Sequence, residues 1–244
     1  MPSNNRLMTF LYHEVCDNPE ESGFVTKNSL QYTHTIAEFE EHLSAIAASE
    51  TVVKDFNEKC DLDKISITFD DGGISALCSA EMLEKYGWRG HYFIATKYIG
   101  QKGFLSSADI SDLRKRGHYI GSHSHSHPKS CRDLSFEALK YEWENSKKIL
   151  EDILSEDVFT ASIPNGQYSG RTLNVLKSSG YSHVFTSMPT VKPWNEKGLV
   201  MYGRFYPKRN TSRVKIEKLS RFEGVYFEYL LRKLKQTLKL KFKG

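Results

Sequence analysis

Runs of β-branched and aromatic residues alternate with helix-length amphipathic segments along most of this 244-residue chain. Such alternation is typical of parallel strands joined by helices, which is the α/β class of fold. The predicted strands span residues 7–13, 65–71, 91–96, 118–124, 158–164, 183–188 and 199–206, and the predicted helices span residues 36–48, 76–86, 108–116, 136–154 and 171–179. About seven strands in roughly 200 residues fit either a (β/α) barrel or a doubly wound sheet.

Start and stop signals support the predicted helices. Ser107 and Ser135 stand where an N-cap hydroxyl would accept hydrogen bonds from free backbone N–H groups. Gly87, Gly117 and Gly180 stand where helices are expected to end, because glycine adopts the left-handed conformation of a C-cap without strain.

Residues able to do chemistry gather at the C-terminal ends of the predicted strands. These are His13, Asp70 with Asp71, the histidines of residues 123–127, and residues 164–166. A (β/α) barrel assembles its active site from several strands at this end. We therefore favour a barrel over a doubly wound sheet.

Composition places the chain among globular proteins. A hydrophobic content of 39% with 26% charged residues excludes an intrinsically disordered chain. The four cysteines lie far apart without a Cys-x-x-Cys pair, which indicates reduced thiols rather than disulfides or a thiolate zinc site. No apolar run approaches the ~20 residues that span a bilayer, and the N-terminal run is too short for a signal peptide. We expect a cytoplasmic protein, unless a leader has been removed.

A basic tail follows the last predicted strand. Residues 208–244 hold 12 of the 34 Lys and Arg residues and 3 of the 30 Asp and Glu residues, so the preceding body is acidic. Apolar residues recur at helical spacing from Leu219 to Phe242, which predicts a basic amphipathic helix. Such a helix can lie on an anionic membrane, or it can pack on the barrel. We predict a barrel domain over residues 1–207 and a helical tail over residues 208–244.

Two adjacent carboxylates followed by two glycines end the predicted strand 65–71, in the sequence SITFDDGG. Successive side chains of a strand point to opposite faces, but the two glycines permit a turn that would bring Asp70 and Asp71 into one pocket. A helix N-cap or a solvated turn is the alternative. Together with histidines elsewhere, the pair predicts one carboxylate that binds a metal ion and one that acts as a base.

The sequence YIGSHSHSHP, residues 119–128, holds three histidines at alternate positions. In a regular strand all three rings would share one face, whereas in a loop His125 would point elsewhere. His123 and His127, four residues apart, could hold a divalent ion together with one carboxylate. A polar surface loop is the alternative.

TFDDG and HSHSHP, in this order, resemble the first two motifs of the polysaccharide deacetylases, which are the NodB-homology enzymes of carbohydrate esterase family 4. The resemblance extends over residues 7–206. It implies a distorted, incomplete (β/α) barrel of about seven parallel strands, and metal-dependent removal of an acyl group from a sugar. The matching positions are Asp70 for the catalytic base and Asp71, His123 and His127 for the metal ligands, while His125 falls on a variable position.

The later motifs depart from the family pattern. Ser162 of SIPNG stands where the family has an arginine, although the proline and the glycine are retained. The backbone N–H of Asn165 would then be the oxyanion donor. Arg204 is expected to replace the missing arginine beside Asp70. The last strand, LVMYGRFY, has no histidine where the usual catalytic acid would be.

FLYHEV near the N-terminus resembles the branch of the family that includes the poly-N-acetylglucosamine deacetylases. In that branch the motif order is permuted and the acid histidine comes from the first strand, which makes His13 the expected catalytic acid. A histidine that merely lies at a strand end is the alternative.

The resemblance thus predicts a metal-dependent hydrolase that removes an N-acetyl group from an amino sugar of a glycan or glycan precursor in surface-glycan biosynthesis. One divalent ion is expected, zinc first, with nickel or cobalt as alternatives. A deformylase of a sugar intermediate and a catalytically inactive glycan-binding barrel are the alternative functions. The basic tail suggests a lipid-linked or nucleotide-linked substrate and peripheral contact with the inner membrane face, and no nucleic-acid partner is expected.

Overall fold

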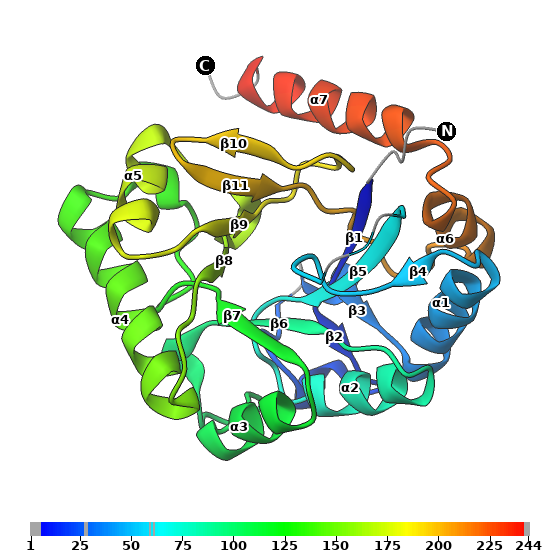
Figure 1. The fold of residues 1–244 in the computed structure, drawn as a ribbon, viewed down its shortest axis with the longest axis horizontal. Coiled ribbons are helices and arrows are strands. Elements are labelled where there is room, and N and C mark those ends of the chain that lie inside the picture. The colour runs from blue at the N-terminus through cyan, green and yellow to red at the C-terminus, as the bar shows by residue number, and fades with distance from the viewer. Residues whose placement is uncertain (1–5, 27–28, 59, 61, 242–244) are drawn as a thin grey trace.

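The computed structural model describes residues 6–26, 29–58, 60 and 62–241 (Figure 1). Its centre is a nine-stranded sheet in the order β1-β5-β6-β7-β8-β9-β11-β10, with β4 paired to β5. The strands of this sheet are β1 (Leu7–Tyr12), β4 (Val52–Val53), β5 (Lys64–Phe69), β6 (His91–Ile94), β7 (Tyr119–Ser122), β8 (Thr160–Ser162), β9 (His183–Phe185), β10 (Trp194–Glu196) and β11 (Leu199–Tyr202). A small second sheet pairs β2 (Glu14–Val15) with β3 (Thr33–His34).

The large sheet curls into an open half-barrel. Parallel pairing runs from β1 through β5, β6, β7, β8 and β9 to β11. An isolated bridge links Phe10 of β1 to Phe205, which follows β11, and the Phe205 N–H donates to the Thr9 carbonyl at 2.8 Å. The prediction of a distorted, incomplete (β/α) barrel is confirmed, and the doubly wound alternative is wrong.

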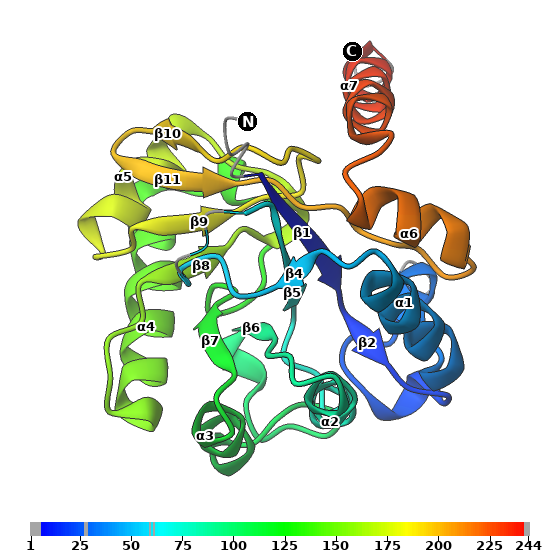
Figure 2. The same ribbon diagram turned by 45° about the vertical axis from the view of Figure 1, so that its right-hand side comes forward.

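Helices cover the outside of the curled sheet (Figure 1). They are α1 (Ile36–Ala48), α2 (Ala76–Lys85), α3 (Ser107–Lys115), α4 (Phe136–Leu154), α5 (Gly170–Ser178), α6 (Arg213–Ser220) and α7 (Val225–Lys241). The last of these, α7, lies beyond α6 (Figure 2), and its Arg232 contacts Tyr206. Among the described residues, no helix combines the length and the apolar character needed to cross a membrane.

The seven predicted strands and the five predicted helices are all present, with small differences at their ends. Ser106, rather than Ser107, caps α3, because its hydroxyl accepts from the Asp109 N–H while the Asp109 carboxylate accepts from the Ser106 N–H. Ser135 caps α4 as expected. The three glycines predicted at helix ends all have positive φ.

Strand alternation separates two apolar layers. Outward-facing side chains such as Ile65 and Ile67 of β5 pack beneath the helices. The interior of the barrel is filled by a mainly aromatic cluster formed by Leu7, Phe56, Phe93, Phe185 and Tyr202. Toward the C-terminal ends of the strands, the inward-facing side chains become polar. These polar side chains therefore lie above the aromatic cluster.

The basic tail forms two helices rather than the single predicted one. The chain breaks between α6 and α7, where Phe222 and Gly224 have φ of +63° and +71°. Leu219 and Phe222 are buried in the core. Tyr226 lies on α7 and is exposed. The spacing suggested one continuous apolar face, but it could not show that a left-handed turn divides it. Phe242 lies outside the described residues.

The first part of the tail packs against the barrel. The Thr211 carbonyl is 2.9 Å from the Nε2 atom of His42 of α1, and the hydroxyl of Thr51 donates to the Ser220 carbonyl at 2.8 Å. These contacts attach α6 to the body. The domain boundary at residue 207 stays a prediction.

Candidate metal centre

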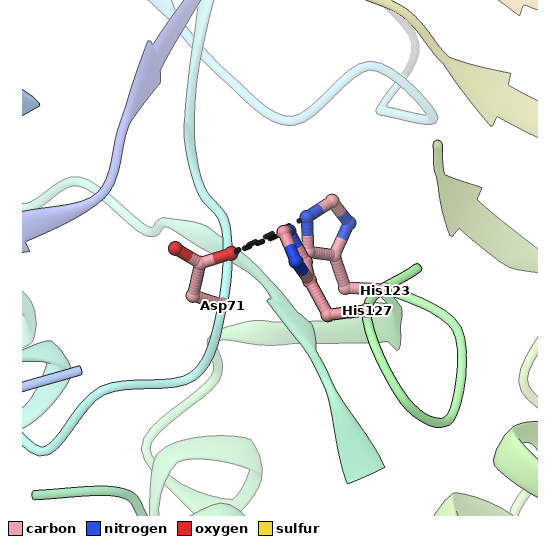
Figure 3. Close-up of side chains that lie close together, drawn as sticks. All are labelled: Asp71, His123 and His127. Atoms are coloured by element: carbon pink, nitrogen blue, oxygen red, sulfur yellow. Dashed lines mark ion pairs between the residues drawn. The ribbon is translucent and has the colours of Figure 1, made fainter. Parts of the chain in front are cut away.

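Three potential metal ligands converge at the C-terminal ends of β5 and β7 (Figure 3). The Oδ1 atom of Asp71 lies 3.4 Å from the Nε2 atom of His123 and 3.3 Å from the Nε2 atom of His127. One potential ligand atom from each residue lies within 4.8 Å of the others. The three side chains that the motifs single out are therefore neighbours in space.

An unusual backbone turn brings both aspartates to this place. Asp70 continues the inward-facing side of β5, and Asp71 would point outward if the strand went on. Instead, Asp71 has a φ of +79° and Gly72 a φ of +83°. A side chain at Gly72 would also be cramped, because a Cβ atom there would lie 3.2 Å from the side chain of Ile94. This turn explains why glycine follows the two carboxylates.

Hydrogen bonding fixes the free nitrogen of His123. Its Nδ1 atom lies 2.8 Å from the Ser162 carbonyl, which can only accept, so Nδ1 carries the hydrogen. In the neutral ring the lone pair is then on Nε2, which faces Asp71. The Oδ1 atom of Asp71 is buried and has no hydrogen-bond partner in the described part of the chain.

A carboxylate on α4 holds the histidine loop. Glu142 accepts hydrogen bonds from the backbone N–H groups of His125 and Ser126, at 3.0 and 2.7 Å, and from the Ser126 hydroxyl. The His125 ring turns away from Asp71, with its Nδ1 atom 3.0 Å from the Thr96 hydroxyl. The alternating histidines do not share a face, because β7 ends at Ser122.

Asp70 makes a buried bidentate ion pair with Arg204. Nη1 and Nη2 of Arg204 each donate to one carboxylate oxygen at 2.8 Å, and the Ser162 hydroxyl donates to the carboxylate at 3.0 Å. Arg204 also donates from Nη2 to Ser162 at 2.7 Å and from Nε to the Thr186 carbonyl at 3.1 Å. The arginine thus reaches Asp70 from beyond β11, while Ser162 occupies the end of β8.

These contacts decide the charges in the site. Burial alone would raise the pKa of Asp70, but the charges of Arg204 and His123 outweigh it and lower the pKa. Burial likewise opposes ionisation of Asp71, yet its histidine neighbours lower its pKa. Burial lowers the pKa of His123, and the two carboxylates more than reverse that effect. The site therefore holds two ionised carboxylates that attract a cation.

His13 and Asn165 lie at the ends of two further strands. His13 follows β1, its ring centroid is 5.2 Å from that of Tyr32, and its buried Nδ1 atom has no hydrogen-bond partner in the described structure. Its charge also contributes to lowering the pKa of Asp70 and Asp71. Asn165 is exposed in the turn after β8 with a φ of +56°.

A further buried carboxylate beside the site, Glu14, was not anticipated from the sequence. Glu14 accepts hydrogen bonds from the hydroxyls of Ser22 and Ser75, and burial raises its pKa to about 7. These contacts anchor the loop that carries Phe24, whose ring centroid lies 5.0 Å from that of His127. The only sequence signal for Glu14 is a carboxylate next to a histidine at the end of an apolar strand.

Comparisons with known proteins agree with this architecture. A sequence model of the polysaccharide deacetylase family matches residues 57–184, just over half of the chain. YxkH of Bacillus subtilis, whose name assigns it provisionally to the polysaccharide deacetylases, is 31% identical over 134 residues, which are 54% of this chain and 46% of YxkH. A 30.6 kDa protein of Geobacillus stearothermophilus is 28% identical over 180 residues, which are 72% of this chain and 64% of that protein. The chain thus spans about half to two thirds of these curated relatives.

Solved structures share the fold at low sequence identity. The deacetylase PplD of Streptococcus pyogenes, in complex with acetate, has a TM-score of 0.74 at 19% identity, covering 89% of this chain and 98% of PplD. IcaB of Ammonifex degensii has a TM-score of 0.75 at 16% identity, covering 90% and 98%. BC0361, a polysaccharide deacetylase of Bacillus cereus, has a TM-score of 0.74 at 18% identity, covering 89% and 69%.

Replacing Arg204 by Leu should destabilise the protein by about 3–5 kcal/mol at pH 7, because it leaves Asp70 charged and buried without its partner. Without the guanidinium, less opposes the effect of burial, so the pKa of Asp70 should be higher than in the parent and the carboxyl group takes up a proton at a higher pH. The parent loses its own Asp70 contribution as the pH falls below the ordinary value of 3.8. The difference between parent and variant should therefore be smaller at pH 4 than at pH 7 in denaturant unfolding.

Arg114→Leu is the matched control, since Arg114 pairs with Glu156 at a largely exposed position. It should cost about 1 kcal/mol or less. Adding Asp70→Asn to Arg204→Leu should restore part of the lost stability at pH 7. Equal losses of unfolding free energy for Arg204→Leu and Arg114→Leu would show that the buried ion pair contributes no more to stability than the Arg114–Glu156 pair does.

Proposed function

The chain belongs to the polysaccharide deacetylase family, the NodB-homology enzymes of carbohydrate esterase family 4, and we propose that it removes an N-acetyl group from an amino sugar. The observation that carries the proposal is the convergence of Asp71, His123 and His127 beside an ionised second carboxylate, Asp70. PplD, which shares the fold, was solved with acetate, the acid that this reaction would release. The sugar belongs to a glycan or a glycan precursor in this proposal.

The ligand set fits a divalent metal ion. Asp71 offers a buried oxygen without a hydrogen-bond partner, and His123 offers an Nε2 lone pair that its Nδ1 hydrogen bond orients. Two imidazole nitrogens and one carboxylate suit a first-row divalent metal. We propose zinc, with nickel or cobalt as alternatives. A metal ion bound to these residues would polarise the amide carbonyl and make the attacking water more acidic.

Asp70 is the proposed general base. It is ionised, and its two bonds with Arg204 fix the plane of the carboxylate. Its Oδ2 atom lies 3.7 Å from the Nε2 atom of His123, which places it beside the three ligands without being one of them. Asp70 would accept a proton from the water that attacks the acetyl carbonyl carbon.

His13 and Asn165 are proposed to complete the reaction. A protonated His13 would donate a proton to the departing amine nitrogen, so that the products are acetate and a free amino sugar. The backbone N–H of Asn165 makes no hydrogen bond in the described structure and would donate one to the oxyanion of the tetrahedral intermediate. In support of this role, the Nδ1 atom of His13 is not engaged by another group in the described structure.

Asp70→Asn should keep metal binding and lower the rate of acetate release about 10²–10⁴-fold, because it removes the base but not the ligands. The measurement is acetate release from an N-acetylglucosamine oligomer, with metal content determined on the same samples. Asp112→Asn, at an exposed position on α3, is the control and should match the parent. A fully active Asp70→Asn variant would refute the base assignment. Release of formate from an N-formyl sugar in place of acetate would identify a deformylase.

His13→Ala should separate amide from activated-ester hydrolysis. An amine must be protonated as it leaves, whereas p-nitrophenolate leaves without a proton. The variant should therefore lose about 10²-fold or more on the N-acetyl sugar and much less on p-nitrophenyl acetate. His183→Ala, at the start of β9, is the control. Equal losses on both substrates would mean that His13 supports the site rather than supplying a proton.

We also propose that α7 contacts an anionic membrane surface, at the inner face in the cytoplasm. Tyr226, Phe227 and Leu234 all lie on this helix and are 71%, 62% and 60% exposed, and exposed apolar side chains that gather on one surface can mark an interaction site. After Glu228 every charged residue of the tail is Lys or Arg. Exposed apolar groups next to a row of cations are the combination that interfacial helices use.

Phe227→Ser combined with Leu234→Ser should abolish most binding to vesicles that contain phosphatidylserine, measured by co-sedimentation. The charge of the tail is unchanged in this variant, so only the apolar contribution is removed. Val25→Ser, at an exposed apolar residue far along the chain from α7, is the control. Parent protein that does not bind these vesicles would refute the membrane contact.

A further inference from the structure

A cavity of about 200 Å³ lies outside the ligand cluster and has two arginines in its wall. Arg132 comes from the segment before α4, and Arg232 comes from α7. The remaining wall consists of neutral residues, and none of the residues that line the cavity is Asp or Glu. The proposed reaction uses neither arginine.

The cavity adjoins the candidate active site on two sides. Gly166 and Thr186 belong to its wall. Gly166 lies in the turn that contains Asn165, and the Thr186 carbonyl accepts from Arg204, the partner of Asp70. A ligand in the cavity would therefore touch the same strand ends that position the proposed base.

A row of aromatic rings connects Arg232 to His13. Arg232 donates from Nη1 to the Tyr206 hydroxyl at 2.6 Å, and its guanidinium carbon lies 5.1 Å from the centre of that ring. The Tyr206 ring is 6.1 Å from Tyr32, and the Tyr32 ring is 5.2 Å from His13. The arginine thus lies two rings away from the proposed acid.

Both guanidinium groups have donors left for a ligand. The Nε atom of Arg232 is buried and has no hydrogen-bond partner in the described structure. Within the part of the chain that the structure describes, Arg132 donates only from its Nε atom, to the Tyr168 carbonyl at 3.2 Å. A buried donor without an acceptor is unfavourable, and each such group calls for an explanation. Glu196, which interacts with Tyr168, accepts from the Trp194 indole at 3.2 Å, and no ion pair joins it to either arginine among the described residues.

We propose that this cavity binds a phosphate group carried by the substrate, so that the enzyme acts on a phosphorylated N-acetyl amino sugar rather than on a neutral polymer. The inference rests on the proposed deacetylase function. Arginine matches phosphate because its planar fork donates two parallel hydrogen bonds to one phosphate group. Two arginines supply two positive charges, which balance a phosphate dianion, and the neutral wall offers no carboxylate to compete for them.

The binding test uses inorganic diphosphate as the probe and calorimetry on the full chain. Arg132→Met and Arg232→Met should each weaken binding about tenfold, the effect of losing one charge-assisted contact. Lys233→Met is the matched control, because it removes a positive charge from the next position of α7 without touching the cavity wall. It should bind as the parent does. If the parent and both arginine variants bind diphosphate with the same affinity, the proposed site is refuted. This outcome includes the case in which the probe binds elsewhere on the protein.

The kinetic test compares acetate release from N-acetylglucosamine 1-phosphate and from N-acetylglucosamine. The parent should prefer the phosphorylated sugar, and the ratio of the two kcat/KM values should fall about tenfold in Arg132→Met and Arg232→Met, but not in Lys233→Met. An unchanged ratio would refute the inference. If neither sugar is deacetylated, the proposed function fails, and calorimetry still decides whether the cavity binds phosphate.

Two further substrates distinguish whether the phosphate group of the substrate belongs to a nucleotide or to a lipid carrier. A nucleoside-diphosphate sugar and a short-chain prenyl-diphosphate sugar present the same group with different attachments. The higher kcat/KM of the two identifies the source, and the preference for either over the unphosphorylated sugar should disappear in both arginine variants.

Discussion

The buried ion pair between Arg204 and Asp70 is the interaction on which the site depends. It links Asp70, which follows β5, to Arg204, which follows β11. The two residues are 134 positions apart in the sequence. Arg204 is fully buried and reaches Asp70 through both terminal nitrogens, while its Nε atom is bonded to the Thr186 carbonyl. Two charges can remain buried only when their hydrogen-bonding groups are satisfied in this way. The same contacts keep Asp70 ionised, as the proposed base must be.

Neighbouring carboxylates acquire different roles because their surroundings differ. Asp70 accepts hydrogen bonds from Arg204 and Ser162, so its charge is balanced within the protein. Asp71 has an oxygen without a hydrogen-bond partner in the described structure, directed at His123 and His127. The surroundings therefore make the second carboxylate, and not the first, the proposed metal ligand. Because the surroundings of the two residues differ, Asp70 is the proposed base and Asp71 is the proposed metal ligand.

Local patterns in the sequence were enough to predict the strands, most helix ends and the meeting of the two aspartates with the histidines, whereas the choice of Asp71, His123 and His127 as the ligand set came from the resemblance to the polysaccharide deacetylases. Alternating strands and helices fix the direction of the strands, so polar residues at their C-terminal ends must meet. Contacts that depend on how far the sheet curls were harder to predict. Arg204 was expected beside Asp70 only from its place near a strand end, and Glu142 was missed because a helix carboxylate can face inward or outward. The break between α6 and α7 depends on one left-handed turn that apolar spacing does not show.

The cavity, the tail and the ligand cluster are parts of one proposal, in which the barrel performs the reaction and the tail completes the substrate site. The proposed reaction depends on whether Asp71, His123 and His127 hold a metal ion. The most direct measurement is elemental analysis of the purified protein and of the double variant His123→Ala/His127→Ala, with zinc, nickel and cobalt determined together. The account predicts about one equivalent of metal in the parent and none in the variant. A parent that holds no metal, even after zinc is added back and excess is removed, would contradict it.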